Sequence, residues 1–109
     1  MKLDSKFIWM NGALLPHDKA VVPFLTPALH YGTAVFEGMR AYETPHGPAI
    51  FRLKDHIERL FASARIFGFG DLPWTPAEVI AGSKAVVREN GFNECYVRPL
   101  IFAPSGHMG

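Results

Sequence analysis

The chain has 109 residues, of which 49% are hydrophobic and 19% charged, and its formal net charge is +1. These values fit one soluble globular domain, and they exclude the strongly basic surface that nucleic-acid-binding proteins carry. The single cysteine, Cys95, excludes an internal disulfide and favours a reducing, cytoplasmic location. Asn11 and Gly12 interrupt the N-terminal apolar run, so we expect neither a signal peptide nor a membrane span.

The first predicted element is a β-hairpin. Asn11-Gly12 is a strong two-residue turn signal, and apolar segments at Phe7–Met10 and 13–15 flank it. Residues 16–27 predict a loop, with a short strand expected at 21–22. Three further strands are predicted at 35–42, 49–51 and a mostly buried 95–103, and the turn-rich segment 43–48 joins the first two.

Two helices are predicted between these strands. The first covers Leu53–Phe67 and ends at Gly68, and its apolar stripe consists of Leu53, Ile57, Leu60, Phe61 and Ala64. The second begins after Thr75, which has a capping-box pattern followed by proline, and ends before Gly91. Hairpin-ordered strands with two helices predict an α+β sandwich with a mostly antiparallel sheet.

The predicted strand 35–42 has an unusual composition for a core strand. Its alternation puts Phe36, Gly38, Arg40 and Tyr42 on one face and Val35, Glu37, Met39 and Ala41 on the other. A strand glycine often marks the close approach of a ligand or backbone, and a charge among apolar residues is costly unless it is paired. An edge strand with one solvated face is the plainer interpretation of the same pattern.

Residues 30–42, HYGTAVFEGMRAY, resemble the signature of the branched-chain amino acid aminotransferases, which are fold-type IV enzymes that use pyridoxal 5'-phosphate (PLP). Similar segments follow the family's order at residues 9–12, 49–53, 56–60 and 96–100. The resemblance therefore covers nearly the whole chain. It implies a PLP-dependent enzyme that moves an amino group between L-leucine, L-isoleucine or L-valine and 2-oxoglutarate.

The same resemblance implies that residues 1–109 are the small N-terminal domain of a longer enzyme. The chain stops soon after its last predicted strand, which we interpret as truncation or proteolysis. The Schiff-base lysine of the family belongs to the missing C-terminal domain. The lysines present lie in terminal, loop or helical positions without an apolar setting, so we expect the chain alone to be inactive: Lys2, Lys6, Lys19, Lys54 and Lys84.

The resemblance assigns cofactor binding to Arg59, which would hold the PLP phosphate. Arginine suits that role because its planar fork matches phosphate oxygens and stays charged. From spacing alone, Arg59 shares a helical lane with His56 and Ser63 and would be interpreted as a solvated arginine.

The resemblance assigns substrate binding to Tyr96 and Arg98, which would hold the α-carboxylate and accommodate the acidic side chain of glutamate. The residues alone suggest a tyrosine–arginine stacking pair at a sheet edge. Phe36 would form part of the apolar wall, although a lone phenylalanine is more commonly core. Gly38 would leave room for the substrate.

Three more residues of the signature have expected roles. Tyr31 would reach the active site of the neighbouring subunit, which implies a homodimer or a higher homo-oligomer. Arg40 would contribute polar contacts at the pocket edge, and Glu37 would be a structural partner. His30 receives no catalytic role and is expected in the core or at an interface.

Other chemistries lack their motifs in this sequence. Gly68-Phe69-Gly70 does not open a helix after a strand, the histidines have no metal-ligand spacing, and no Gly-x-Ser-x-Gly elbow occurs. Two alternatives remain: another fold-type IV enzyme (a D-amino acid or (R)-amine transaminase, or aminodeoxychorismate lyase), and a non-catalytic binding domain. We also expect self-association of the isolated chain through an apolar patch of Phe36, Tyr96 and Phe102.

Overall fold

A computed structural model describes residues 5–104, so Lys2 and the ends of the predicted 1–109 domain lie outside the described residues. The predicted hairpin is present, with β1 at Phe7–Met10 and β2 at Ala13–Pro16. Asn11 and Gly12 both have positive φ angles, 54° and 89°, as a two-residue hairpin turn requires. A side-chain clamp then fixes the hairpin to a helix, because the Asn90 amide hydrogen-bonds both the backbone N–H and the C=O of Phe7, each at 3.0 Å.

The segment between the hairpin and the central strands differs from the prediction. No strand forms at residues 21–22; instead a 3-10 helix spans His17–Lys19 and a short helix α1 spans Pro27–Tyr31. The predicted strand was wrong: residues 20–22 pair with no strand, and the Val21 N–H donates to the Lys19 carbonyl in a tight turn. Helix α1 was missed because its single turn is too short for a periodic pattern, and a proline at the start of a helix resembles the end of a loop.

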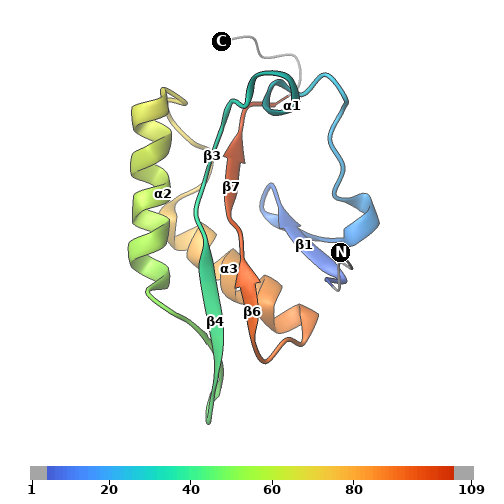
Figure 1. The fold of residues 1–109 in the computed structure, drawn as a ribbon, viewed down its shortest axis with the longest axis vertical. Coiled ribbons are helices and arrows are strands. Elements are labelled where there is room, and N and C mark those ends of the chain that lie inside the picture. The colour runs from blue at the N-terminus through green and yellow to red at the C-terminus, as the bar shows by residue number, and fades with distance from the viewer. Residues whose placement is uncertain (1–4, 105–109) are drawn as a thin grey trace.

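The central strands form one long antiparallel ribbon with a break in each strand. β3 (Ala34–Phe36) pairs with β7 (Leu100–Phe102), and β4 (Met39–Thr44) pairs with β6 (Cys95–Val97) and with β5 (Gly47–Ile50). The register is the same on both sides of the breaks, with Phe36 opposite Leu100 and Met39 opposite Val97. Figure 1 shows β3 leading into β4 beside β6 and β7.

The break has a local chemical cause. The Glu37 N–H donates to the Pro99 carbonyl at 3.1 Å, but Pro99 has no N–H with which to return the bond. The predicted strands 35–42 and 95–103 are therefore each divided in two. The second was also expected to be mostly buried, which is wrong: of its residues only Val97 is buried, because the outer face of the ribbon is open.

The two long helices have the predicted limits, with α2 at Leu53–Phe67 and α3 at Pro76–Asn90. Thr75 and Glu78 form the capping box of α3, and the stop residues Gly68 and Gly91 adopt left-handed conformations at φ 96° and 70°. All five residues of the predicted α2 stripe are buried. None of the helices described here is long and apolar enough to cross a membrane.

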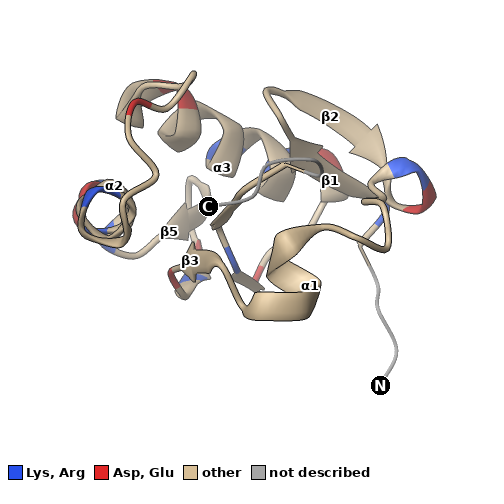
Figure 2. Ribbon diagram, turned by 90° about the horizontal axis from the view of Figure 1, so that it is seen from above, with Lys and Arg blue, Asp and Glu red and all other residues tan. Residues whose placement is uncertain are grey.

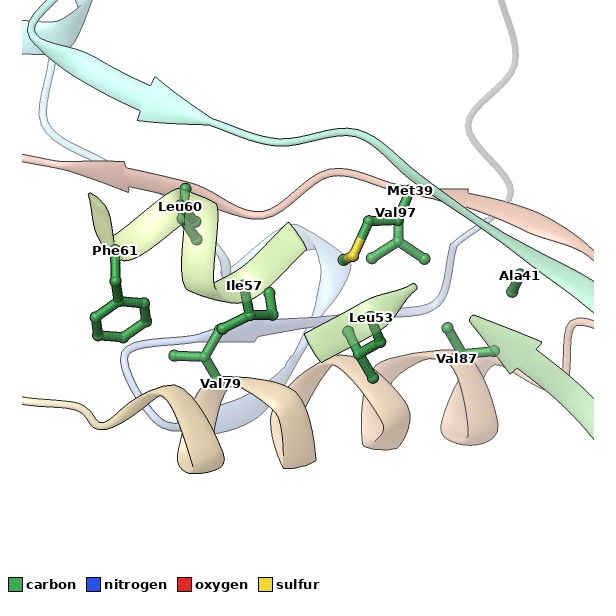
Figure 3. Close-up of a cluster of buried hydrophobic side chains, with 9 residues drawn as sticks. All are labelled: Met39, Ala41, Leu53, Ile57, Leu60, Phe61, Val79, Val87 and Val97. Atoms are coloured by element: carbon green, nitrogen blue, oxygen red, sulfur yellow. The ribbon is translucent and has the colours of Figure 1, made fainter. Parts of the chain in front are cut away.

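The hydrophobic core lies between the ribbon and the two helices. Met39, Ala41 and Val97 point from the strands toward Leu53 and Ile57 of α2 and toward α3 (Figure 3). Ile57 is fully buried, and burial of a side chain of this size contributes about 1.5–3 kcal/mol. Seen from above, α3 lies on one side of the strands and α1 on the other (Figure 2). The predicted α+β sandwich with a mostly antiparallel sheet is confirmed.

Candidate functional site

Apart from Tyr31, which lies on α1, the predicted substrate-binding residues lie on the face of the ribbon that points away from α2 and α3. Cross-strand pairing puts Arg40 opposite Tyr96 and Phe36 opposite Leu100 on this face. Phe36 and Tyr96 are 57% and 51% exposed, so neither belongs to the core. The alternation of residues 35–42 that the sequence predicts is confirmed, since Met39 and Ala41 on the opposite face are buried.

Arg98 joins these aromatic residues into one cluster. Its guanidinium carbon lies 4.4 Å from the centre of the Phe36 ring and 5.3 Å from that of Tyr96, and its Nη2 donates a 2.7 Å hydrogen bond to the Tyr96 hydroxyl. The stacking pair that the residues suggest is therefore present, and Phe36 is part of it. The result is an exposed aromatic wall with a cation at its rim.

Gly38 allows Tyr96 to lie against the ribbon. A Cβ atom at residue 38 would overlap the Tyr96 hydroxyl and come within 3.0 Å of Cζ. In this structure the group that occupies the space beside Gly38 is thus the tyrosine of the same cluster. A glycine within a strand often marks the close approach of another group, and at Gly38 that group is the Tyr96 side chain.

On the helix side of the break, Glu37 accepts three side-chain hydrogen bonds. Arg59 donates from Nε at 2.7 Å and from Nη2 at 2.8 Å, and His56 donates from Nδ1 at 2.8 Å. Glu37 is only 7% exposed, whereas His56 and Arg59 are 22% and 66% exposed. His56 and Arg59 meet the same carboxylate because residues three apart share a helix face.

This pairing shifts the ionisation of the carboxyl group. The hydrogen bonds from Arg59, opposed by burial and supported by His56, lower the pKa of Glu37 from 4.5 to about 2. The same contact raises the pKa of Arg59 above its ordinary value. Glu37 is therefore an anion and Arg59 a cation throughout the neutral range. The third residue of the predicted lane, Ser63, makes no side-chain hydrogen bond in the part of the chain described.

The sequence did not assign Glu37 and His56 to this site as functional residues. Glu37 was expected to be a structural partner, and its partners are now identified. The signal was present, because a carboxylate on the helix-facing side of a strand needs a counter-ion, and His56 and Arg59 share the nearest helical lane. Which helix would pack there was not visible in the sequence.

The remaining predicted residues lie apart from the Glu37 cluster. Tyr31 is exposed at the end of α1, and Arg40 is exposed on β4. His30 is exposed rather than core, and its Nε2 lies 2.8 Å from the Phe24 carbonyl oxygen. Phe102 is half-buried, so the expected patch of Phe36, Tyr96 and Phe102 is only partly exposed.

A hollow of about 980 Å³ separates the hairpin from β7. Of the predicted site residues only Tyr31 and Arg98 line it, together with apolar residues that include Trp9 and Leu60. No group of three or more potential metal-ligating side chains occurs among residues 5–104. Lys6, Lys19, Lys54 and Lys84 are all exposed.

The fold and the arrangement of this ribbon are those of the small domain of a fold-type IV enzyme. Residues 34–109 match the family described as amino-transferase class IV, and the chain belongs to that family.

Individual relatives agree with this family. The branched-chain-amino-acid aminotransferase of Pseudomonas aeruginosa is 46% identical over 102 residues, which cover 94% of this chain and 33% of the relative. Two solved structures of the T.th. branched-chain amino acid aminotransferase are 47% identical; each comparison covers 99% of this chain and 36% of that one. The structure complexed with N-(5'-phosphopyridoxyl)-L-glutamate has a TM-score of 0.92, and the structure with 4-methylvaleric acid has 0.91. The chain spans about a third of the length of these relatives.

Proposed function

We propose that the chain is the small N-terminal domain of a PLP-dependent branched-chain aminotransferase. The complete enzyme transfers the amino group between L-leucine, L-isoleucine or L-valine and 2-oxoglutarate. The family match and the relatives' names support the proposal, and so does the aromatic wall of Phe36 and Tyr96 under Arg98. That wall is the single observation in the structure that favours this substrate class.

The wall suits the two kinds of side chain that such an enzyme must accept. A branched aliphatic group can pack on the exposed Phe36 ring, and the carboxylate of glutamate can pair with the Arg98 guanidinium 4.4 Å above it. The T.th. relative has been solved with N-(5'-phosphopyridoxyl)-L-glutamate and with 4-methylvaleric acid, which has a branched aliphatic chain, and this supports the assignment. Tyr96 orients Arg98, Gly38 admits Tyr96, and Arg40 extends the polar rim.

Arg59 fits the proposed cofactor phosphate. Glu37 occupies Nε and Nη2, so the Nη1 amino group has no hydrogen-bond partner among residues 5–104 and can donate to a phosphate oxygen. PLP supplies the electron sink that allows the bond at the α-carbon to break and the amino group to move. The lysine that reacts with PLP belongs, in this proposal, to the rest of the enzyme, since the four described lysines are exposed on the surface.

We further propose that the complete enzyme is a homodimer or higher homo-oligomer in which Tyr31 reaches the neighbouring active site. Tyr31 ends a helix whose surroundings are apolar and exposed, including Phe24, Leu25 and Leu29. Contiguous exposed apolar residues favour an interface. An aromatic ring at such a contact can cover the adjacent substrate without a change in the fold of either subunit.

The substrate class is tested with the complete protein and its Arg98→Met variant. We expect transfer from L-leucine to 2-oxoglutarate and none from D-alanine. The variant is expected to lower kcat/KM for L-glutamate by about tenfold or more, because it removes a charge-assisted contact. The decrease in kcat/KM for L-leucine is expected to be smaller. Arg88→Met, on the exposed side of α3, is the matched control. Activity toward D-alanine but not L-leucine would contradict the proposal.

The fragment assignment is tested on the 109-residue chain itself. The chain is incubated with PLP, reduced with borohydride and weighed by intact-mass spectrometry. We expect no stoichiometric adduct, because an exposed lysine lacks the desolvated setting that favours reaction with PLP at neutral pH. A single adduct on one lysine would instead make this chain a cofactor site in its own right.

A further inference from the structure

Glu37 holds Arg59 in one orientation. Both hydrogen bonds between them, at 2.7 and 2.8 Å, come from the same edge of the guanidinium, so they fix its plane as well as its place. Arg59 is 66% exposed, and an exposed arginine without such a contact samples many rotamers. The contact therefore determines where the unused Nη1 amino group points.

Glu37 is itself held from two further directions. His56 donates to Oε1 at 2.8 Å, and the Glu37 backbone N–H donates to the Pro99 carbonyl at 3.1 Å. The side chain is 7% exposed, so little space remains for another rotamer. Its chain neighbours are Phe36 of the aromatic wall and Gly38 under Tyr96. The anchor of Arg59 thus lies between a residue of the wall and the glycine that receives the Tyr96 hydroxyl.

We propose that Glu37 is a positioning residue that fixes Arg59 for the phosphate of the cofactor. This inference rests on the proposed function. It adds that three consecutive residues place the phosphate contact relative to the substrate wall, because Glu37 binds Arg59, Phe36 belongs to the wall and Gly38 receives Tyr96. Glu37 itself touches no substrate, and His56 acts by holding Glu37.

Two effects of Glu37 on phosphate binding oppose one another. Its negative charge repels phosphate, whereas its hydrogen bonds spare Arg59 the rotamer entropy that an arginine otherwise loses when it binds. The Arg59 guanidinium lies between the Glu37 carboxylate and the phosphate and is largely exposed, so solvent screens the repulsion between these two anions. The fixed orientation therefore dominates, and loss of Glu37 is expected to weaken phosphate binding rather than strengthen it.

The test compares PLP with pyridoxal, which lacks the phosphate, as ligands of the complete protein. Dissociation constants are measured by absorbance for wild type, Glu37→Gln, Arg59→Ala and the double variant. We expect Glu37→Gln to reduce the preference for PLP over pyridoxal by about tenfold, the size of a lost hydrogen bond to a charged group. In the Arg59→Ala background Glu37→Gln is expected to have no further effect on that preference.

The matched control is Glu58→Gln. It removes an exposed carboxylate on α2, the helix that carries Arg59, and the Glu58 Oε1 lies 3.9 Å from the Lys54 Nζ. This control should leave the PLP preference unchanged. An unchanged or increased preference in Glu37→Gln overturns the inference, because Glu37 would then be a structural or merely repulsive charge. An equal loss in the Arg59→Ala background also overturns it, since Glu37 would not act through Arg59.

A second measurement covers the case in which Glu37→Gln does not fold. In wild-type protein labelled with nitrogen-15 arginine, the Arg59 Nε–H signal, assigned by its loss in Arg59→Lys, should be rigid and exchange slowly. A mobile, rapidly exchanging signal overturns the inference. If the wild-type protein binds neither PLP nor pyridoxal, the proposed function fails and the inference fails with it. If the wild-type protein binds PLP and Glu37→Gln keeps the same preference for PLP over pyridoxal, the inference is overturned and the proposed function stands.

Discussion

Gly38 shows how one residue without a side chain determines the shape of the substrate wall. The Tyr96 hydroxyl occupies the space where a Cβ would lie, and Arg98 then donates to that hydroxyl. The position of the Arg98 guanidinium thus depends on the absence of a Cβ atom at Gly38. The backbone of Gly38 does not have a positive φ, so packing and not conformation accounts for the glycine.

Gly38→Ala is expected to displace Tyr96 and to lower the free energy of unfolding by about 1–3 kcal/mol, the usual cost of overpacking. Urea denaturation of the chain measures this loss. Tyr96→Phe is the companion variant, because it removes the overlapping oxygen. Gly38→Ala should cost less in the Tyr96→Phe background than in wild type, and an equal cost in both would show that Tyr96 is not the obstacle.

Glu37 makes the stability of the domain depend on acid. Its pKa is about 2 in the folded chain against 4.5 for the free group, so between these values the folded state binds fewer protons than the unfolded state. The contribution of Glu37 is complete above about pH 4.5 and is lost as the pH falls toward 2.

We therefore expect the free energy of unfolding, measured in urea from pH 6 to pH 2, to fall more steeply for wild type than for Glu37→Gln. The variant should also be less stable at neutral pH by about 1–3 kcal/mol, the range for hydrogen bonds to charged groups. Glu58→Gln, whose carboxylate is exposed, should keep the wild-type slope. Parallel slopes for wild type and Glu37→Gln would refute the assignment of this acid sensitivity to Glu37.

At the scale of elements, local signals accounted for the helices better than for the strands. The limits of α2 and α3 follow from an apolar stripe, a capping box and terminal glycines, all of which act within a few residues. The strand breaks could be predicted only with knowledge of which residue pairs with which on the neighbouring strand. Pro99 interrupts the ladder only because Glu37 lies opposite to it, and the sequence does not state that register.

The packing of β1 against α3 depends on Gly82. A Cβ there would lie 2.6 Å from Cδ2 and 2.8 Å from Cζ2 of Trp9, whose ring packs on the core. Alanine in place of a helical glycine ordinarily stabilises by about 0.5–1 kcal/mol, but overpacking costs about 1–3 kcal/mol. The clash is therefore expected to exceed the gain.

Gly82→Ala should thus lower the free energy of unfolding in urea. In a Trp9→Leu background, which removes the indole ring, the same substitution should become neutral or stabilising. If Gly82→Ala stabilises the protein with Trp9 intact, then the hairpin can move away from α3 without cost, and the tight packing of these elements is not needed for stability.

At the scale of the whole molecule, the apolar residues around α1 are exposed in the isolated chain, as are Phe36 and Tyr96 on the ribbon. Exposed apolar surface of this extent favours association. We expect concentration-dependent self-association of the chain, mainly through α1.

Sedimentation velocity of wild type and Leu29→Asp tests this expectation. The aspartate adds a charge to the apolar surface and should shift the protein toward monomer, since burial of an unpaired carboxylate is costly. Ile66→Asp is the control, because Ile66 is a similarly exposed apolar residue, 88% exposed, on α2 rather than on α1. A wild-type chain that stays monomeric at high concentration would contradict the prediction, and so would equal effects of the two variants.

The amino-acid sequence is sufficient to predict the hairpin, both long helices with their limits, the apolar stripe of α2 and the family to which the chain belongs. The hairpin, the helices and the stripe depend on turns, caps and periodicity, which are interactions between near neighbours in the chain, whereas the family is indicated by the resemblance of residues 30–42 and the segments that follow. The three-dimensional packing was needed to see that Glu37 binds Arg59 and His56, that Gly38 receives Tyr96, and that Phe36 lies under Arg98. The partners in these contacts are 19 or more residues apart for Glu37, and the others join one strand to another. Their placement depends on strand register and helix packing, which no local pattern specifies.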